Sequence, residues 1–244
     1  MIKKEEFDSL LRDGFSEMGI EITETMKEQF WTYMNFLQSE NRKYNLTGLD
    51  QPEEIIFRHF MDSAAIFSPV PEKNWEYVLD IGSGAGFPGM VYNILHPELP
   101  VFFLDARRKR VLFLKMLASR LDLSGSKISI VHGRAEEYAH EKTHRAKYNP
   151  VVSRAVAPLN VLCEYCLPFV KISGLMYAYK SINYKQELAE ANNAISVLGG
   201  RLVKEHVIKV PGIKKKRVIL AIEKVRETPG KYPRSPGKPK KSPL

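Results

Sequence analysis

The spacing of apolar side chains predicts helices along the first part of the chain. Between residues 4 and 18 they recur every three or four positions, which is the period of an amphipathic helix. Thr23 is a favoured capping residue and stands before a second stretch with the same period. Pro52 suits the first position of a third helix, which we expect to run to about Phe67. We assign residues 1–70 to a helical cap that packs on the main domain.

The pattern changes near residue 77, where short apolar runs begin to alternate with stretches of helical period. The runs have the length of buried strands and lie at 77–82, 101–106, 127–133, 151–156 and 174–180. Continuous apolar strands separated by helices indicate a parallel sheet covered on both faces. No helix separates the last two runs, at 201–210 and 216–225. We therefore predict an α/β fold over residues 71–225, with a mainly parallel seven-stranded sheet that ends in an antiparallel strand pair.

Composition narrows the class of protein. The chain is 44% hydrophobic and 27% charged, as expected of a globular protein. It has no apolar run of about 18 residues for a membrane span and no apolar secretion signal at its start. We expect a cytoplasmic monomer that does not bind membranes. Lysines and arginines exceed acids by 37 − 28 = 9, which favours an anionic partner.

The two cysteines, Cys163 and Cys166, form a C-x-x-C pair inside an apolar stretch that has helical character. A redox or metal role needs a reactive turn or further ligands, which this stretch does not supply. We predict two buried free thiols on one face of a helix, and we expect no metal site.

The last segment, residues 226–244, holds five prolines, six basic residues and one acid. Such a composition predicts an extended segment with no core. It is either a solvated end or a flexible arm that contacts phosphates. In the second case its removal should weaken the binding of a polyanion such as RNA and leave the affinity for a small ligand nearly unchanged. The basic runs 107–110 and 214–217 also favour RNA.

The strongest local motif is DIGSGAGFPG at residues 80–89, a glycine-rich turn that follows a strand. Gly82, Gly84 and Gly86 would let the backbone approach a bound nucleotide closely. The same loop also fits the dinucleotide fingerprint G-x-G-x-x-G. The glycines alone therefore do not distinguish the two kinds of cofactor.

Acidic residues beside the loop favour S-adenosyl-L-methionine. Asp80 at the loop entrance suits the ammonium and sulfonium of that cofactor, whereas a pyrophosphate would be repelled. Asp105, at the end of the next strand, is placed to bind ribose hydroxyls. The alternatives are a loop acid that accepts backbone N–H bonds for Asp80 and a helix cap for Asp105. The terminal antiparallel pair also makes a nicotinamide-binding domain unfavoured.

Two further residues follow later strands. Glu136, together with the backbone of Ala135, is placed to bind adenine, or else Glu136 is a solvated acid in a first helical turn. Arg154 ends the fourth strand and can hold a carboxylate, a phosphate or a carbonyl oxygen. It stays protonated, so we expect Arg154 to be a catalytic residue that organises the active centre without acting as a base. A plain surface arginine is the alternative.

The residues that the chain lacks bear on its chemistry. Neither cysteine is placed as a nucleophile for methylation of pyrimidine C5. Asn149-Pro150 resembles part of the motif of enzymes that methylate exocyclic amines, but it precedes the fourth strand instead of following it. Guanine N7 remains consistent, because its in-plane lone pair carries no proton and needs no base.

Taken together, these motifs resemble the bacterial small-subunit ribosomal RNA methyltransferase G family, also called glucose-inhibited division protein B. The likeness runs from about residue 20 to the end. Its motifs are Asn45-Leu46-Thr47, Arg58-His59, Asp62-Ser63, residues 80–89, GRAEE at 133–137, SRAVAPL at 153–159 and the segment 232–244. The resemblance implies a Rossmann-like class I methyltransferase.

The resemblance also implies a reaction and a set of residues. The reaction is methyl transfer to N7 of a guanosine in the decoding-region loop of 16S ribosomal RNA, with the RNA or the small ribosomal subunit as partner. Cofactor binding is implied for Gly82, Phe87, Ala135, Glu136 and Arg154.

On the substrate side we expect Arg58, His59 and Lys180, although His59 or Asp62 could instead be structural. Two other functions stay open: methylation of a small molecule or protein, and non-catalytic RNA binding.

Overall fold

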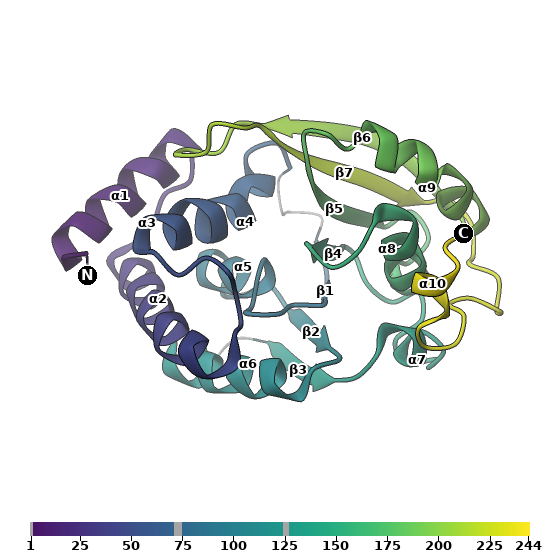
Figure 1. Ribbon diagram of the computed structural model, residues 1–244, viewed down its shortest axis with the longest axis horizontal. Helices are drawn as coiled ribbons and strands as arrows, with labels where there is room; N and C mark the ends of the chain where they lie inside the picture. The colour runs from purple at the N-terminus through teal and green to yellow at the C-terminus, as the bar shows by residue number, and fades with distance from the viewer. Residues whose placement is uncertain (1, 71–74, 124–126) are drawn as a thin grey trace.

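A computed structural model describes residues 2–70, 75–123 and 127–244 (Figure 1). They form one seven-stranded sheet in the order β3-β2-β1-β4-β5-β7-β6. The strands are β1 (Val78–Ile81), β2 (Val101–Asp105), β3 (Ile128–His132), β4 (Val151–Arg154), β5 (Leu175–Ser181), β6 (Gly200–Ile208) and β7 (Arg217–Lys224). The predicted strands and the α/β class are confirmed.

The sheet is parallel from β1 to β5, and β7 runs antiparallel to both β5 and β6. Every residue of β1 and β2 is buried, because helices cover both faces. Alternate strand residues therefore enter different cores: Phe103 packs on the side of α5 (Gly89–Leu95) and α6 (Arg108–Arg120). Phe102 belongs to the core on the other face, to which α8 (Leu159–Cys166) and α9 (Lys185–Val197) also contribute.

Helix α8 carries both cysteines. Cys163 and Cys166 are fully buried free thiols, as predicted. Burial raises the pKa of the Cys163 thiol to about 12, so it is protonated and unreactive at neutral pH.

The cap begins with α1 (Lys4–Glu17) and α2 (Glu24–Tyr44). The Thr23 hydroxyl accepts a backbone hydrogen bond from the first turn of α2 at 3.2 Å, which confirms the predicted cap. Phe36 of α2 stacks on Phe113 of α6 with 5.3 Å between ring centroids. No described helix, the 21-residue α2 included, is long and apolar enough to cross a bilayer.

The cap and one face of the sheet share a single apolar core. The expected boundary between them, at residue 71, lies outside the described residues. The division into residues 1–70, 71–225 and 226–244 therefore stays a prediction.

The third predicted helix has the expected extent but an irregular interior. It consists of α3 (Pro52–Ile55), a π-helical turn (Ile56–Met61), α4 (Asp62–Ala64) and a 3₁₀ turn (Ala65–Phe67). The π-helical turn carries Arg58 and His59. Such turns are often found at functional sites, and apolar spacing does not reveal them.

Residues 226–244, here called the C-terminal segment, are folded against the rest of the protein. In Figure 1 the segment, drawn in yellow, lies beside α7 (Ala135–Tyr138) and α8. Tyr232 is buried in the core on that face, and a short helix, α10 (Lys238–Lys241), follows. The prediction of an extended, coreless segment is wrong, because charged side chains outside the segment bind it in place.

Candidate active site

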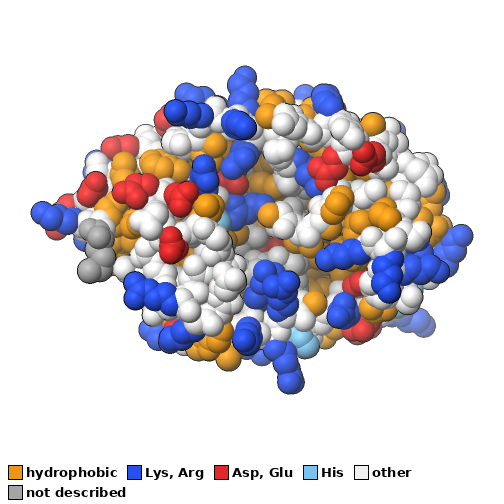
Figure 2. Space-filling view, viewed as in Figure 1, with side chains coloured by type: hydrophobic (Ala, Val, Ile, Leu, Met, Phe, Trp, Pro, Cys, Tyr) orange, Lys and Arg blue, Asp and Glu red, His pale blue; other side chains and the backbone are white. Residues whose placement is uncertain are grey.

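Three predicted site residues lie where neighbouring strands end. Gly82 follows β1, Asp105 ends β2 and Arg154 ends β4. Because these strands are adjacent and parallel, their carboxyl ends meet at one edge of the sheet. Two cavities open there and share Ala155. Figure 2 shows a hollow near the middle of the molecule, with lysine and arginine side chains around it.

The first cavity, of about 350 Å³, brings together several of the predicted cofactor residues. It is lined by Gly82, Asp105, Ala135 and Glu136. Its volume is in the range of small-molecule sites, about 300–1,000 Å³. Two carboxylates facing one cavity provide acceptors for ligand hydroxyl and amino groups.

Asp105 is held in a fixed orientation by backbone donors. Its Oδ2 accepts a hydrogen bond from Gly84 N at 3.0 Å, and its Oδ1 accepts one from Arg107 N at 2.8 Å. The cap of α6 is Arg107, so Asp105 is not itself the helix cap. Arg110 Nη1 lies 3.5 Å from the same Oδ2. Carboxylate oxygens offer about four acceptor positions, so at least one remains for a ligand.

Asp80 lies beneath the glycine loop, away from the first cavity. It is fully buried, and its Oδ2 accepts a hydrogen bond from Gly89 N, at the start of α5, at 2.9 Å. Burial raises the pKa of this carboxyl to about 7. A dinucleotide would place its pyrophosphate at this helix end, which the Asp80 carboxylate already occupies. The site therefore fits a cofactor without phosphate, while a direct contact of Asp80 with cofactor cations stays a prediction.

The loop glycines differ in what they approach. Gly82, Gly84 and Gly86 have φ values of +71°, +60° and +98°, which favour glycine. A Cβ on Gly82 would lie 2.5 Å from Val156, which lines the first cavity. A Cβ on Gly86 would lie 2.6 Å from the Tyr33 hydroxyl. Gly86 thus permits close packing against the cap.

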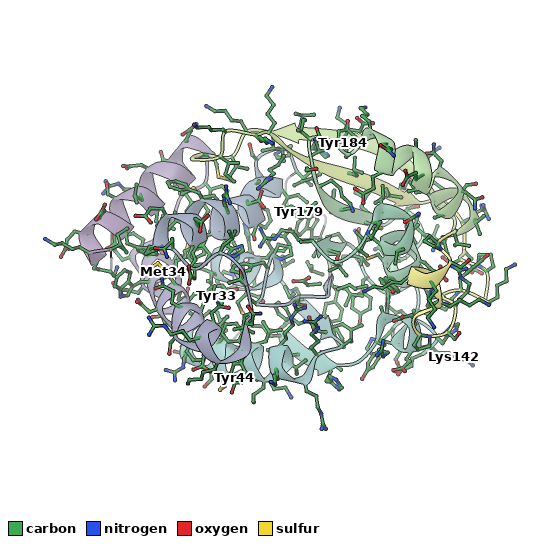
Figure 3. All side chains as sticks on the ribbon, in the orientation of Figure 1. Tyr33, Met34, Tyr44, Lys142, Tyr179 and Tyr184 are labelled. Carbon is green, nitrogen blue, oxygen red and sulfur yellow. The ribbon has the colours of Figure 1, made fainter. Side chains whose placement is uncertain are left out.

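Phe87 joins the loop to the cap and to the second cavity. Its ring stacks on Tyr33 with 5.2 Å between centroids and on His59 with 4.4 Å. The Arg154 guanidinium lies 5.0 Å from the Phe87 centroid. The Tyr33 hydroxyl donates to Ala85 O at 2.5 Å, and Figure 3 shows Tyr33 reaching from α2 toward the middle of the molecule. These contacts fix the position of the glycine loop relative to Arg154.

Arg154 bonds to the π-helical turn and the residue after it. Its Nη1 donates to Arg58 O and to Asp62 Oδ2, each at 2.9 Å. Its Nη2 lies 3.0 Å from His59 Nδ1. Since a guanidinium only donates, Nδ1 must accept, and the proton of neutral His59 is on Nε2, which donates to Thr47 Oγ1 at 2.8 Å. The plain surface arginine of the alternative interpretation does not describe Arg154.

His59 is held neutral. Burial, followed by the charge of Arg154, lowers the pKa of His59 to about 3. Both of its ring nitrogens are engaged in hydrogen bonds. His59 therefore cannot take up a proton near neutral pH.

The second cavity, of about 380 Å³, contains the residues expected on the substrate side. Arg58, His59 and Lys180 line it together with Asp62 and Arg217. The Lys180 ammonium donates to Glu187 Oε1 at 2.5 Å and to Ala157 O at 3.0 Å. A charged lysine fixed by these two acceptors lies on the cavity wall.

Tyr179 is a site residue that the sequence did not indicate, and Arg217 was indicated only as the last residue of the basic run 214–217. Arg217 Nε donates to Asp62 Oδ1 at 3.0 Å, so Asp62 joins Arg217 to Arg154. Tyr179 of β5, labelled in Figure 3, lines the same cavity and donates to Ser63 O at 2.7 Å. The motif Asp62-Ser63 indicated that these two positions matter, but the sequence could not show that Arg217 and Tyr179, more than 100 positions away, are their partners.

Glu136 is buried instead of solvated. It is 7% exposed and lines the first cavity. Its Oε1 accepts a hydrogen bond from Gly237 N, in the C-terminal segment, at 3.1 Å. The carboxylate is therefore oriented by a residue 101 positions away, which the sequence did not indicate.

Comparison with known sequences identifies the relatives of this chain. Residues 26–218 match the family described as rRNA small subunit methyltransferase G. The protein named ribosomal RNA small subunit methyltransferase G of Alkaliphilus metalliredigens is 43% identical, over 96% of this chain and 98% of that relative. The protein of the same name from Clostridium botulinum is 41% identical, over 98% and 99%.

Solved structures share the fold at low sequence identity. The mitomycin 7-O-methyltransferase MmcR has a TM-score of 0.56 at 13% identity, over 80% of this chain and 60% of that chain. An S-adenosylmethionine-dependent methyltransferase of Leishmania major has a TM-score of 0.54 at 13% identity, over 82% and 83%. The class I Rossmann-like fold is thereby confirmed.

Proposed function

This chain belongs to the rRNA small subunit methyltransferase G family, and we propose that it methylates N7 of a guanosine in 16S ribosomal RNA. It is an S-adenosylmethionine-dependent rRNA methyltransferase. One observation carries the choice of N7: the described residues around Arg154 offer no free base. Arg154 stays protonated, His59 is neutral with both nitrogens bonded, and Asp62 is paired with two arginines. An atom that already has a free lone pair suits such a site.

The first cavity is the proposed place of the adenosine half of the cofactor. Asp105 would accept hydrogen bonds from the ribose hydroxyls, with its backbone bonds setting its orientation. Glu136 would accept from the adenine amino group, next to the backbone of Ala135. Gly82 lines the same cavity, and its missing side chain allows Val156, another lining residue, to pack against the loop backbone there.

Four further residues would act by shaping the loop. Asp80 holds the start of α5, Gly84 bonds to Asp105, and Gly86 and Phe87 pack against the cap. When bound, the cofactor supplies an electrophilic methyl group on a sulfonium. When ionised, the Asp80 carboxylate below the glycine loop would attract the positively charged sulfonium bound on the opposite side of that loop.

The second cavity is the proposed place of the guanine. Arg154 would orient it by donating to O6 or to a phosphate, and Arg58, Lys180 and Arg217 add positive charge for the RNA backbone. Arg154 cannot grip O6 and N7 together, because that would occupy the lone pair that must react. The protein thus acts by alignment and electrostatics instead of proton transfer.

We also propose that the enzyme works as a cytoplasmic monomer on 16S rRNA or on the small subunit. The excess of nine positive charges supports an RNA partner. Few large apolar side chains are exposed in the described residues, among them Leu112, Ile172 and the β6 residues Val203 and Val207, which supports the monomer.

The target atom can be tested with RNA analogues. A transcript of the decoding-region loop is made with guanosine, with 7-deazaguanosine or with inosine. We expect methyl transfer to the guanosine and inosine transcripts, which keep N7, and none to the 7-deazaguanosine transcript. Equal labelling of the 7-deazaguanosine transcript would reject N7, and loss confined to inosine would point to the exocyclic amine.

A further inference from the structure

We propose that the C-terminal segment is part of the cofactor site: it forms a wall of the first cavity on the adenine side, and Lys240 is a cofactor-binding residue. This inference rests on the proposed position of the adenosine in that cavity. It replaces the expectation that the segment acts only as an end or an RNA arm, remote from the cofactor.

Two residues of the C-terminal segment line the first cavity. Gly237 and Lys240 do so together with Glu136 and Tyr165. Gly237 N donates to Glu136 Oε1 at 3.1 Å, so the segment bonds to the carboxylate proposed to bind adenine. The φ of Gly237 is +82°, a conformation that favours glycine and that presents this N–H to Glu136.

A buried ion pair anchors the segment close to the cavity. Arg234 Nη2 lies 2.6 Å from Glu164 Oε2, and Arg234 N and Nε both donate to Glu164 Oε1 at 2.8 Å. Glu164 is fully buried on α8, next in sequence to the cavity residue Tyr165. A paired and hydrogen-bonded buried charge strongly favours one position of its partner.

Arg145 and His140, which follow α7 in the sequence, form a second anchor for the segment. Arg145 donates to the carbonyl oxygens of Thr228 and Tyr232 at 2.8 and 2.9 Å. His140 Nε2 lies 2.8 Å from Pro233 O. The segment is thus bound both to α8, through Glu164, and to the residues that follow α7. These contacts fix its position on the adenine side of the cavity.

The chemistry of Lys240 suits the adenosine half of the cofactor. Its ammonium offers three donors and no acceptor, whereas adenosine presents ring nitrogens and ribose oxygens as acceptors. Lys238 and Lys241, on the same short helix, are exposed and do not line the first cavity. They provide matched controls for charge without cavity contact.

If the C-terminal segment contacts the cofactor, cofactor binding should stabilise the docked position of the segment. If the cofactor binds the docked segment better than an undocked one, then cofactor binding and docking strengthen each other by the same factor. The proposal therefore predicts two independent readouts, ligand affinity and protection of the segment from proteolysis.

The affinity test uses calorimetry of S-adenosylhomocysteine, with no RNA present. We expect Lys240→Met to weaken binding by about three- to tenfold, the value of one hydrogen bond, and Lys241→Met to leave it unchanged. Gly237→Val, which strains the turn at positive φ, should weaken binding more than Gly230→Val. Gly230 lies in the same segment with nothing within 4 Å of a Cβ.

The proteolysis test uses the unaltered chain and trypsin. S-adenosylhomocysteine should slow cleavage after Lys240 and Lys241, while cleavage after Lys215, in the β6–β7 turn, stays unchanged. Wild-type affinity in both Lys240→Met and Gly237→Val, with no ligand protection of the segment, would overturn the proposal. If the unaltered chain bound neither S-adenosylmethionine nor its product, the proposed function would fail instead.

Discussion

Replacement of Arg154 tests how the active centre is held together. The guanidinium makes three hydrogen bonds of 2.9, 2.9 and 3.0 Å, with Arg58 O, Asp62 Oδ2 and His59 Nδ1. A lysine ammonium is a point donor and cannot reproduce this planar set. We expect Arg154→Lys and Arg154→Met each to lower the rate of methyl transfer about tenfold or more, equal to about 1.4 kcal/mol.

The same change has a stability cost that the structure bounds. Breaking a buried ion pair costs about 3–5 kcal/mol, but Asp62 keeps Arg217 at 3.0 Å. We therefore expect Arg154→Met to lower the free energy of unfolding by about 2–3 kcal/mol. It should also raise the pKa of His59 from about 3, because the charge of Arg154 is the second cause of the lowering, after burial.

The assays are single-turnover methylation at saturating cofactor, urea unfolding and NMR titration of His59. Arg201→Met is the control, since Arg201 pairs with Glu223 on an exposed part of β6 and β7. Methylation by Arg154→Met at near the wild-type rate would remove Arg154 from the mechanism. An unchanged pKa of His59 would refute the electrostatic part of the reasoning.

Three further changes test other parts of the site. The pKa of His59 is about 3 in the folded state against 6.5 unfolded, so its contribution to stability, at most about 5 kcal/mol, is present above pH 6.5 and lost as pH falls toward 3. His59→Gln should remove that part of the acid sensitivity in urea unfolding. At saturating cofactor, where ionisation of Asp80 no longer affects occupancy, the wild-type rate should stay flat from about pH 6 to 9, whereas a bell-shaped profile would indicate a base. Burial raises the pKa of Asp80 to about 7, so ionisation of this carboxyl lowers the stability of the fold as pH rises from 3.8 to 7. Asp80→Asn should therefore be more stable than wild type at pH 8 but not at pH 4. The same variant should weaken the binding of S-adenosylmethionine more than that of the product, S-adenosylhomocysteine, whose sulfur is uncharged. Equal weakening of the two ligands would deny the carboxylate an electrostatic role. Gly84→Val forces a branched side chain to a φ of +60° beside Asp105, so calorimetry should find no cofactor binding while circular dichroism finds the fold intact.

The sequence predicted the parts of the molecule that depend on local periodicity. Strands such as β1 and β2 are continuous apolar runs, and their burial on both faces explains why they could be recognised. The strand-end positions of Asp105 and Arg154 followed from the same pattern, because parallel strands bring their carboxyl ends together.

What could not be predicted depends on contacts between distant residues. Asp62 and Arg217 are 155 positions apart, and Glu136 and Gly237 are 101 apart. The C-terminal segment has a composition typical of disorder, yet Glu164 anchors it by accepting from Arg234. Single-sequence patterns carry no information on such pairings, and this is why that segment was expected to be extended and without a core.

The central claim is tested most directly by mapping the transferred methyl group. The purified enzyme is incubated with labelled S-adenosylmethionine and unmethylated 16S rRNA, or with small subunits that contain it. The RNA is then treated with borohydride and aniline, which cleave at 7-methylguanosine. We predict one labelled guanosine in the decoding-region loop, with cleavage at that nucleotide. A label on another atom or nucleotide, or no label on either substrate from enzyme that binds the cofactor, would contradict the account.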